Sequence, residues 1–96
     1  MPAPYKPKPI DTSKVTLPSP LLDLTERLAE HAHELWAKQR IKDGWRFGGV
    51  RNDAAKEHPC LIPYDDLPDS EKAYDREVAL GTLKTILALG FRIERC

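Results

Sequence analysis

Long hydrophobic runs are missing from this sequence, and its longest apolar stretches are only a few residues. Because the hydrocarbon core of a bilayer requires about 20 consecutive apolar residues, no membrane insertion is expected. The N-terminal stretch MPAPYKPKPIDTSK also lacks the apolar segment of a signal peptide. We therefore expect a cytoplasmic protein.

Net charge is absent as well, since 15 Lys and Arg residues balance 15 Asp and Glu residues. Without excess positive charge or a basic patch, the chain has little attraction for a phosphate backbone, so nucleic acid is not an expected partner. Cysteine is scarce, with only Cys60 and Cys96. Both are expected to be free thiols, with a Cys60–Cys96 disulfide or a thiol between chains as the alternatives.

The motifs of metal and catalytic centres are also missing. There is no glycine-rich phosphate loop, serine triad or zinc-ligand spacing, so we expect no metal, no cofactor and no enzyme activity. A weak alternative is a hydrolase that uses His58 and Cys60, which share one side of an extended segment. The favoured interpretation is structural, with Pro59 shaping a turn and Cys60 beginning a buried strand.

Two long helical patterns are what the sequence does contain. Apolar residues recurring at spacings of three and four predict helices over about 20–42 and 69–89. Ser19 is the expected N-cap of the first helix, and Gly44 and Gly90 are the expected left-handed caps that end the two helices.

The rest of the chain is predicted to be extended or irregular. Short strands are expected at 45–47 and 60–62, and another at 91–96. Six prolines in the first twenty residues favour an extended N-terminal strap lying on the domain, with residues 1–8 mobile. The fold class is therefore mainly α with minor β. We predict one domain over 9–96, an antiparallel two-helix hairpin with an irregular, strand-bearing insertion.

The first helix has one apolar stripe, which we predict to face the core. The stripe consists of Leu21, Leu24, Leu28, Ala32 and Leu35. In the second helix, Val78 or Ala79, Leu83, Ile86 and Leu87 form the expected apolar face. Gly81 suggests close packing against the first helix, and the charged residues Glu71, Lys72, Asp75 and Arg76 are interpreted as a solvated or salt-bridged face.

The stretch HAHELW, residues 31–36, holds the densest chemistry. His31 and His33 project about 200° apart on a helix and cannot bind one ion together, which argues against a metal site. His33, Trp36 and Arg40 share a stripe about 110° from the leucine stripe, so they are not a simple continuation of the core. They are a candidate platform for a flat, anionic ligand. The alternative is that Trp36 packs in a second core layer with Arg40 lying on its ring.

Four segments together resemble the ryanodine receptor repeat, the RyR domain, over about residues 9–93. They are IDTSKVTLP, HELWAKQRIKDGWRFG, KEHPCLIPY and EKAYDREVALGTLKTILALGF. The resemblance implies a mainly helical, non-enzymatic domain. In calcium-release channels such repeats come as tandem pairs with pseudo-twofold symmetry, and standalone copies in bacteria and phages are suspected of sensing nucleotide-derived signals.

In the channels, a cleft between paired repeats is associated with adenine nucleotides. The resemblance implies that the matching residues are His33 and Trp36, with Arg40, Arg51 and Asn52 as weaker candidates. We therefore expect a binding module for an adenine-nucleotide-like small molecule or a protein partner. A homodimer would replace the tandem pair. The alternative is a purely structural interaction or dimerisation domain.

Overall fold

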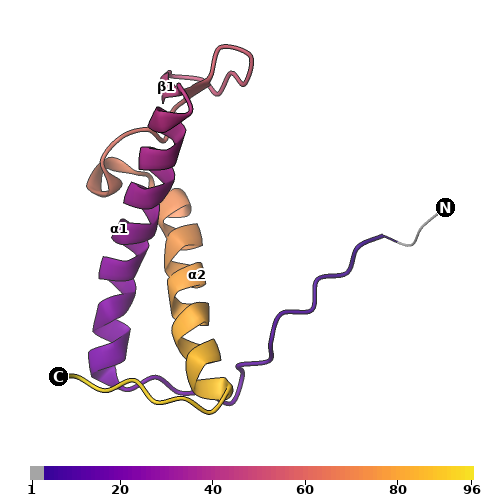
Figure 1. Cartoon of the computed structure of the whole chain (residues 1–96), viewed down its shortest axis with the longest axis vertical. Helices are drawn as coiled ribbons and strands as arrows, with labels where there is room; N and C mark the ends of the chain where they lie inside the picture. The colour runs from indigo at the N-terminus through magenta and orange to yellow at the C-terminus, as the bar shows by residue number, and fades with distance from the viewer. Residues whose placement is uncertain (1–3) are drawn as a thin grey trace.

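Two long antiparallel helices form the body of the protein in the computed structural model, which describes residues 4–96 (Figure 1). Helix α1 covers Ser19–Lys42 and helix α2 covers Asp69–Ala88. The insertion between them contains β1 (Arg46–Phe47), β2 (Glu57–His58) and the 3₁₀ turn η1 (Tyr64–Asp66). The predicted mainly α hairpin with a strand-bearing insertion is thus confirmed.

The ends of both helices follow local backbone chemistry. Gly44 and Gly90 have φ angles of 91° and 93°, the left-handed conformation predicted for both glycines. The predicted cap at Ser19 is wrong. Pro18 occupies the N-cap position, and its carbonyl accepts the backbone N–H groups of Leu21 and Leu22. Ser19 is therefore the first residue of the helix, without a side-chain capping bond.

The buried residues form two separate clusters. The base cluster, at the end of the hairpin where α1 begins and α2 ends, consists of Leu17, Leu21 and Leu83. Leu80, Leu87 and Ile93 pack against it. The loop cluster joins α1 to the insertion and consists of Ala29, Tyr64 and Leu67, with Cys60 and Ile62 packed against it. Between the two clusters, Arg76 of α2 and Glu26 of α1 form a bidentate ion pair, with Nε–Oε2 at 2.6 Å, that connects the helices.

The predicted leucine stripe is not the buried face of α1. Leu24, Leu28 and Leu35 are 39%, 37% and 54% exposed, whereas Ala29 and His33 are 0% and 4% exposed. The small side chain of Ala29 lets Tyr64 pack against the helix, and this contact with a distant segment decides which face is buried. Of the predicted stripe, only Leu21 belongs to the core.

Gly81 does not mark a close approach of the two helices. A Cβ atom built on Gly81 would meet no atom within 4 Å, so the close packing predicted there is wrong. In the rest of α2, Ala79 and Leu83 are buried, Ile86 and Leu87 are half-buried, and Val78 is 66% exposed. The apolar face predicted for this helix is therefore confirmed, with Ala79 rather than Val78 as its first member.

The two strands are parallel, pairing Arg46 with Glu57 and Phe47 with His58. Gly48 follows β1 so closely beside β2 that a Cβ atom there would lie 2.6 Å from the Cβ of Glu57. The second strand therefore lies earlier than the predicted 60–62, and residues 91–96 form no strand. The chain turns after His58 because the Cys60 backbone N–H donates to His58 Nδ1 at 3.0 Å.

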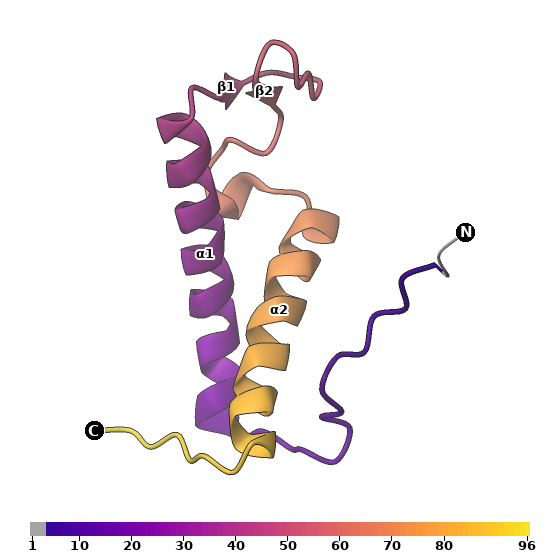
Figure 2. The same ribbon diagram turned by 45° about the vertical axis from the view of Figure 1, so that its right-hand side comes forward.

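The N-terminal segment packs on the domain only where it meets α1. Leu17 is buried and Val15 is half-buried, but Ile10 is 51% exposed, and residues 4–10 lead away from the helices (Figure 2). The strap prediction is therefore confirmed at Val15 and Leu17 and wrong at Ile10. Of the residues predicted to be mobile, 1–3 lie outside the described residues, and the mobility of 4–8 stays a prediction. Within residues 4–96, no helix has the length and apolarity needed to cross a membrane.

Candidate functional site

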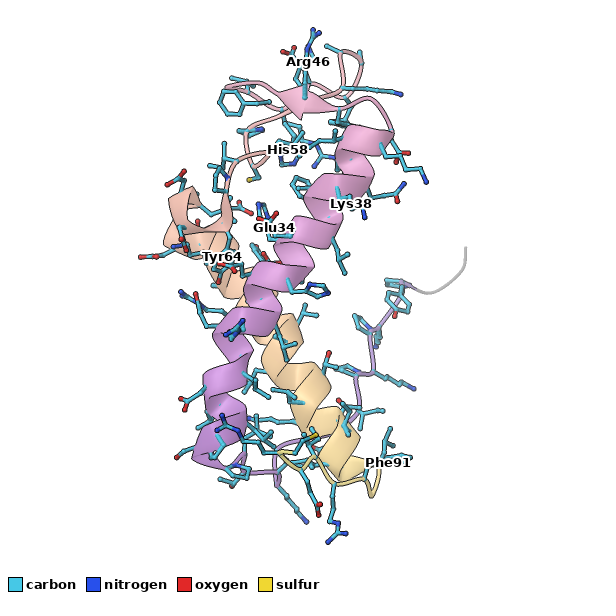
Figure 3. All side chains as sticks on the ribbon, turned by 60° about the vertical axis from the view of Figure 1, so that its left-hand side comes forward. Glu34, Lys38, Arg46, His58, Tyr64 and Phe91 are labelled. Carbon is cyan, nitrogen blue, oxygen red and sulfur yellow. The ribbon has the colours of Figure 1, made fainter. Side chains whose placement is uncertain are left out.

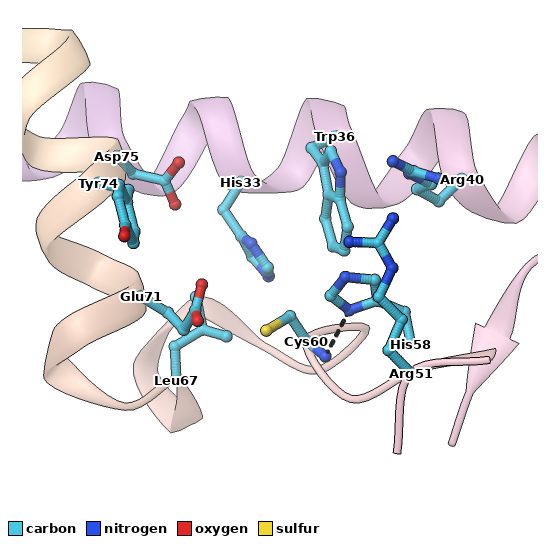
Figure 4. Close-up of a pocket in the computed structure, with 10 residues that line it drawn as sticks. All are labelled: His33, Trp36, Arg40, Arg51, His58, Cys60, Leu67, Glu71, Tyr74 and Asp75. Carbon is cyan, nitrogen blue, oxygen red and sulfur yellow. Dashed lines mark hydrogen bonds between the residues drawn. The ribbon is translucent and has the colours of Figure 1, made fainter. Parts of the chain in front are cut away.

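A hollow of about 270 Å³ opens between α1, the insertion and the first half of α2. Its walls come from all three segments, and the side chains of opposite charge lie on opposite sides (Figure 4). Trp36, Arg40, Arg51 and His58 form what we call the basic wall. Glu71 and Asp75 form the acidic wall, with Tyr74 beside them. All of these lining residues belong to one chain.

His33 is a buried anchor at the floor of this hollow. Its Nε2 lies 2.8 Å from the carbonyl oxygen of Ile62. Because a carbonyl oxygen only accepts hydrogen bonds, Nε2 carries the proton and donates it. The ring also stacks against Trp36, with centroids 5.6 Å apart and planes at 28°. His33 therefore holds the insertion on α1 and fixes the position of Trp36.

Aromatic and cationic groups alternate along the basic wall. Trp36 meets the edge of His58 at a centroid distance of 5.0 Å. The guanidinium carbon of Arg40 lies 5.6 Å from the Trp36 centroid and 4.6 Å from the Trp45 centroid. These contacts hold Arg40 between two indole rings, so its position is set before any ligand arrives. The packing role considered for Trp36 is therefore present, and the residue also faces the hollow.

Figure 3 shows how the insertion presents His58 and Tyr64 on the side that faces α1. His58 reaches this position because β2 runs beside β1, and Tyr64 because η1 follows directly after Pro63. Burial and the nearby guanidinium groups of Arg51 and Arg40 lower the pKa of His58 below its ordinary value. A neutral His58 therefore contributes to the basic wall as an aromatic ring.

The two candidates from the insertion differ in their placement. Arg51 lines the hollow, and its Nε donates to Asp53 Oδ1 at 2.8 Å, which lowers the pKa of Asp53. Asn52 does not line it. The Asn52 side chain accepts the Ala55 N–H at 3.1 Å, and its backbone pairs with Glu57. The structure thus brings together His33, Trp36, Arg40 and Arg51, and places Asn52 in the neighbouring turn.

The family model for the RyR domain matches residues 5–95 of this sequence, nearly its full 96 residues. The chain belongs to the RyR domain family.

The acidic wall of this RyR domain is the part of the site that sequence reasoning missed. Glu71 and Asp75 were interpreted as a solvated or salt-bridged face of α2, but both line the hollow opposite Trp36. Burial raises the pKa of Asp75 above its ordinary value, against a smaller opposing effect of the His33 ring. Their spacing of four places them on one helical face, which was the available signal. The sequence did not reveal that this face meets α1.

His58 and Cys60 of the RyR domain do not form an activated pair. Nδ1 of His58 accepts the backbone N–H of Cys60, and this bond stabilises the turn predicted at Pro59. Burial, reinforced by the carboxylates of Glu71 and Asp75, raises the pKa of the Cys60 thiol. A raised pKa reduces the thiolate fraction that a nucleophile requires. Among residues 4–96, no group of three or more His, Cys, Asp or Glu side chains is placed to hold a metal ion.

Cys60 is expected to react with iodoacetamide at least about tenfold more slowly than Cys96, because its thiol is half-buried and carries a raised pKa. Peptide mass spectrometry over a time course measures both rates in the folded protein. In urea the two thiols should react at similar rates, which provides the control. Faster alkylation of Cys60 than of Cys96 in the folded protein would support the nucleophile hypothesis instead.

Proposed function

We propose that this RyR domain is a non-enzymatic binding module whose hollow takes a nucleotide-like ligand, as a single repeat of the bacterial or phage type. The observation that carries the proposal is the basic wall, where the Trp36 ring lies between the imidazole of His33 and the guanidinium of Arg40. An aromatic face beside fixed cations matches a ligand that joins a flat heterocycle to phosphate.

The size and charge of the hollow favour a particular orientation of the ligand. Its volume of about 270 Å³ lies just below the usual range for ligand cavities of about 300–1,000 Å³, so it has room for one heterocycle rather than a whole dinucleotide. We assign the base to the edge of the Trp36 indole that faces the hollow, because His33 and Arg40 already contact the ring, and the phosphates to the open side, near Arg40 and Arg51. The carboxylates of Glu71 and Asp75 are then placed to accept hydrogen bonds from an exocyclic amine or a ribose hydroxyl.

The ion pair between Arg51 and Asp53 weakens the contact that Arg51 can make with a phosphate. The Asp53 carboxylate occupies part of the donor capacity of Arg51 and offsets its charge. A phosphate that binds Arg51 must compete with this carboxylate. Arg40 has no ion-pair partner within the described residues, so it is the stronger of the two phosphate contacts.

Isothermal titration with ATP, ADP-ribose and cyclic nucleotides tests the assignment. Trp36→Ala is expected to weaken binding by at least about tenfold, because the indole supplies the aromatic surface that the base contacts and also holds Arg40 in place. Trp36→Phe should retain much of the affinity. Arg40→Gln should weaken phosphate-bearing ligands most, and Asp53→Asn should strengthen them.

Arg92→Gln is the matched control for Arg40→Gln, because Arg92 lies in the C-terminal tail with its side chain 86% exposed. It should leave the affinity unchanged. If none of the compounds binds, or if Trp36→Ala binds as tightly as the parent protein, the ligand proposal is wrong. The second candidate function is then favoured, a structural interaction domain. The exposed leucines of α1 support that candidate.

A further inference from the structure

The outer face of α1 carries a row of leucines that the rest of residues 4–96 leaves partly exposed. Leu24, Leu28 and Leu35 are 39%, 37% and 54% exposed, and His31, also exposed, lies between them. Leu28 and Leu35 are seven residues apart, and so are Leu24 and His31. This is the a and d pattern by which two helices pack against one another, rather than the pattern of a solvated face.

We propose that the outer face of α1 pairs with the same face of a second copy of this chain, with the two helices antiparallel. In the register that aligns the leucines, Leu24 packs against the partner's Leu35. Leu28 packs against the partner's His31. Each contact occurs twice because of the twofold symmetry, so the four residues of each chain cover one another.

The charges beside the leucine row select this arrangement. Arg27 and Glu34 precede Leu28 and Leu35, and neither has an ion-pair partner within residues 4–96. In the antiparallel register, Arg27 lies across from the partner's Glu34, and Glu34 lies across from the partner's Arg27. The pattern of charges is therefore self-complementary, as the contact surface of a twofold dimer must be.

A parallel pairing of the same faces is disfavoured by the same residues. It would place His31 against His31 and Lys38 against Lys38 of the two chains. Arg27 and Glu34 would face Ala32 and Gln39 and find no opposite charge across the interface. The Lys38 pair at the end of the seam and the unpaired charges at its edge leave the antiparallel arrangement as the complementary one.

The proposed dimer does not enclose the hollow. His33 and Trp36 lie on the buried side of α1, away from the leucine row, so both hollows stay open to solvent. Trp36 of one chain is level with residue 23 of the other, so the two hollows lie about 20 Å apart along the helix axis. The interface and the ligand site are therefore separate, and failure of one proposal leaves the other standing.

Sedimentation velocity over a range of concentrations tests the pairing, since the monomer mass is 10.9 kDa and the dimer has twice that mass. The parent chain should shift to the dimer as concentration rises. Leu28→Lys should remove the shift. Leu22→Lys should leave the shift unchanged, because Leu22 is an exposed leucine on the opposite side of the same helix. Circular dichroism checks that each variant keeps its helix content.

Exchanging the charges of Arg27 and Glu34 tests the register of the two helices without altering any leucine. Arg27→Glu and Glu34→Arg should each raise the dimer dissociation constant about tenfold, because two symmetry-related surface pairs change from attraction to repulsion. The double variant should recover the parent value. A chain that stays monomeric at the highest concentration overturns the proposal. Dimerisation that survives Leu28→Lys, or a double swap that fails to recover, overturns the face or the register.

Discussion

Replacing Leu83 with alanine is expected to lower the free energy of unfolding by about 3 kcal/mol. Leu83 is 5% exposed and joins α2 to Leu17 and Leu21 in the base cluster. Truncation removes buried methyl groups and leaves a cavity beneath the point where the N-terminal segment, both helices and the C-terminal tail meet. A domain of this length has a total stability of about 5–14 kcal/mol, so the loss is a large share of it.

Urea unfolding followed by far-ultraviolet circular dichroism, which reports on both helices, measures this loss. Val78→Ala is the matched control, because Val78 lies on the same helix and is 66% exposed. It should change the unfolding free energy by less than about 0.5 kcal/mol. Equal losses in the two variants would show that the base cluster is not the core of the helix pair.

Replacing His33 with leucine is expected to cost about 1–3 kcal/mol, although leucine is apolar and similar in size. The variant keeps the burial but removes the one donor that residues 4–96 supply to the partly buried Ile62 carbonyl, and leaving such an acceptor unpaired costs desolvation energy. It also removes the stacked partner of Trp36. The insertion should then separate from α1 before the helices do, which amide hydrogen exchange at residues 57–64 would detect.

Two variants separate this effect from a general loss of histidine. His31→Leu changes the same residue type two positions away at an exposed site, and at concentrations where the chain is monomeric it should leave stability within about 0.5 kcal/mol of the parent. His33→Gln restores an N–H donor and should recover part of the loss. If His33→Leu and His31→Leu are equally stable, His33 does not anchor the insertion.

The helices were predictable from sequence because their limits depend on local chemistry. Gly44 and Gly90 adopt the left-handed conformation wherever the rest of the chain lies, and Pro18 and Pro68 mark the starts in the same way. The predicted limits of 20–42 and 69–89 each lie within one residue of the observed helices.

The core was not predictable by the same reasoning. A run of leucines at helical spacing normally indicates the buried face, but here burial follows Ala29 and His33, which contact Tyr64 and Ile62 about thirty residues further along the chain. Only the tertiary contact shows that a small residue and a histidine are the better fit to the insertion. The exposed leucines then become the observation that needs explanation.

Half of the candidate site was visible in the sequence. His33, Trp36 and Arg40 follow from helical spacing, and the resemblance to the RyR domain added Arg51. The acidic wall was missed because Glu71 and Asp75 resemble an ordinary solvated helix face until α2 is placed beside α1. Proximity in sequence also proved a poor guide for Asn52, whose side chain is used within its own turn.

The base cluster and the loop cluster share no buried residue. The end of the hairpin where α1 begins and α2 ends can therefore loosen while Ala29, Tyr64 and Leu67 keep the insertion seated on α1. Substitutions in the base cluster change how many molecules are folded at a given moment, whereas the recognition surface of each folded molecule stays the same. The fraction of folded protein and the geometry of the hollow are thus open to independent adjustment during evolution.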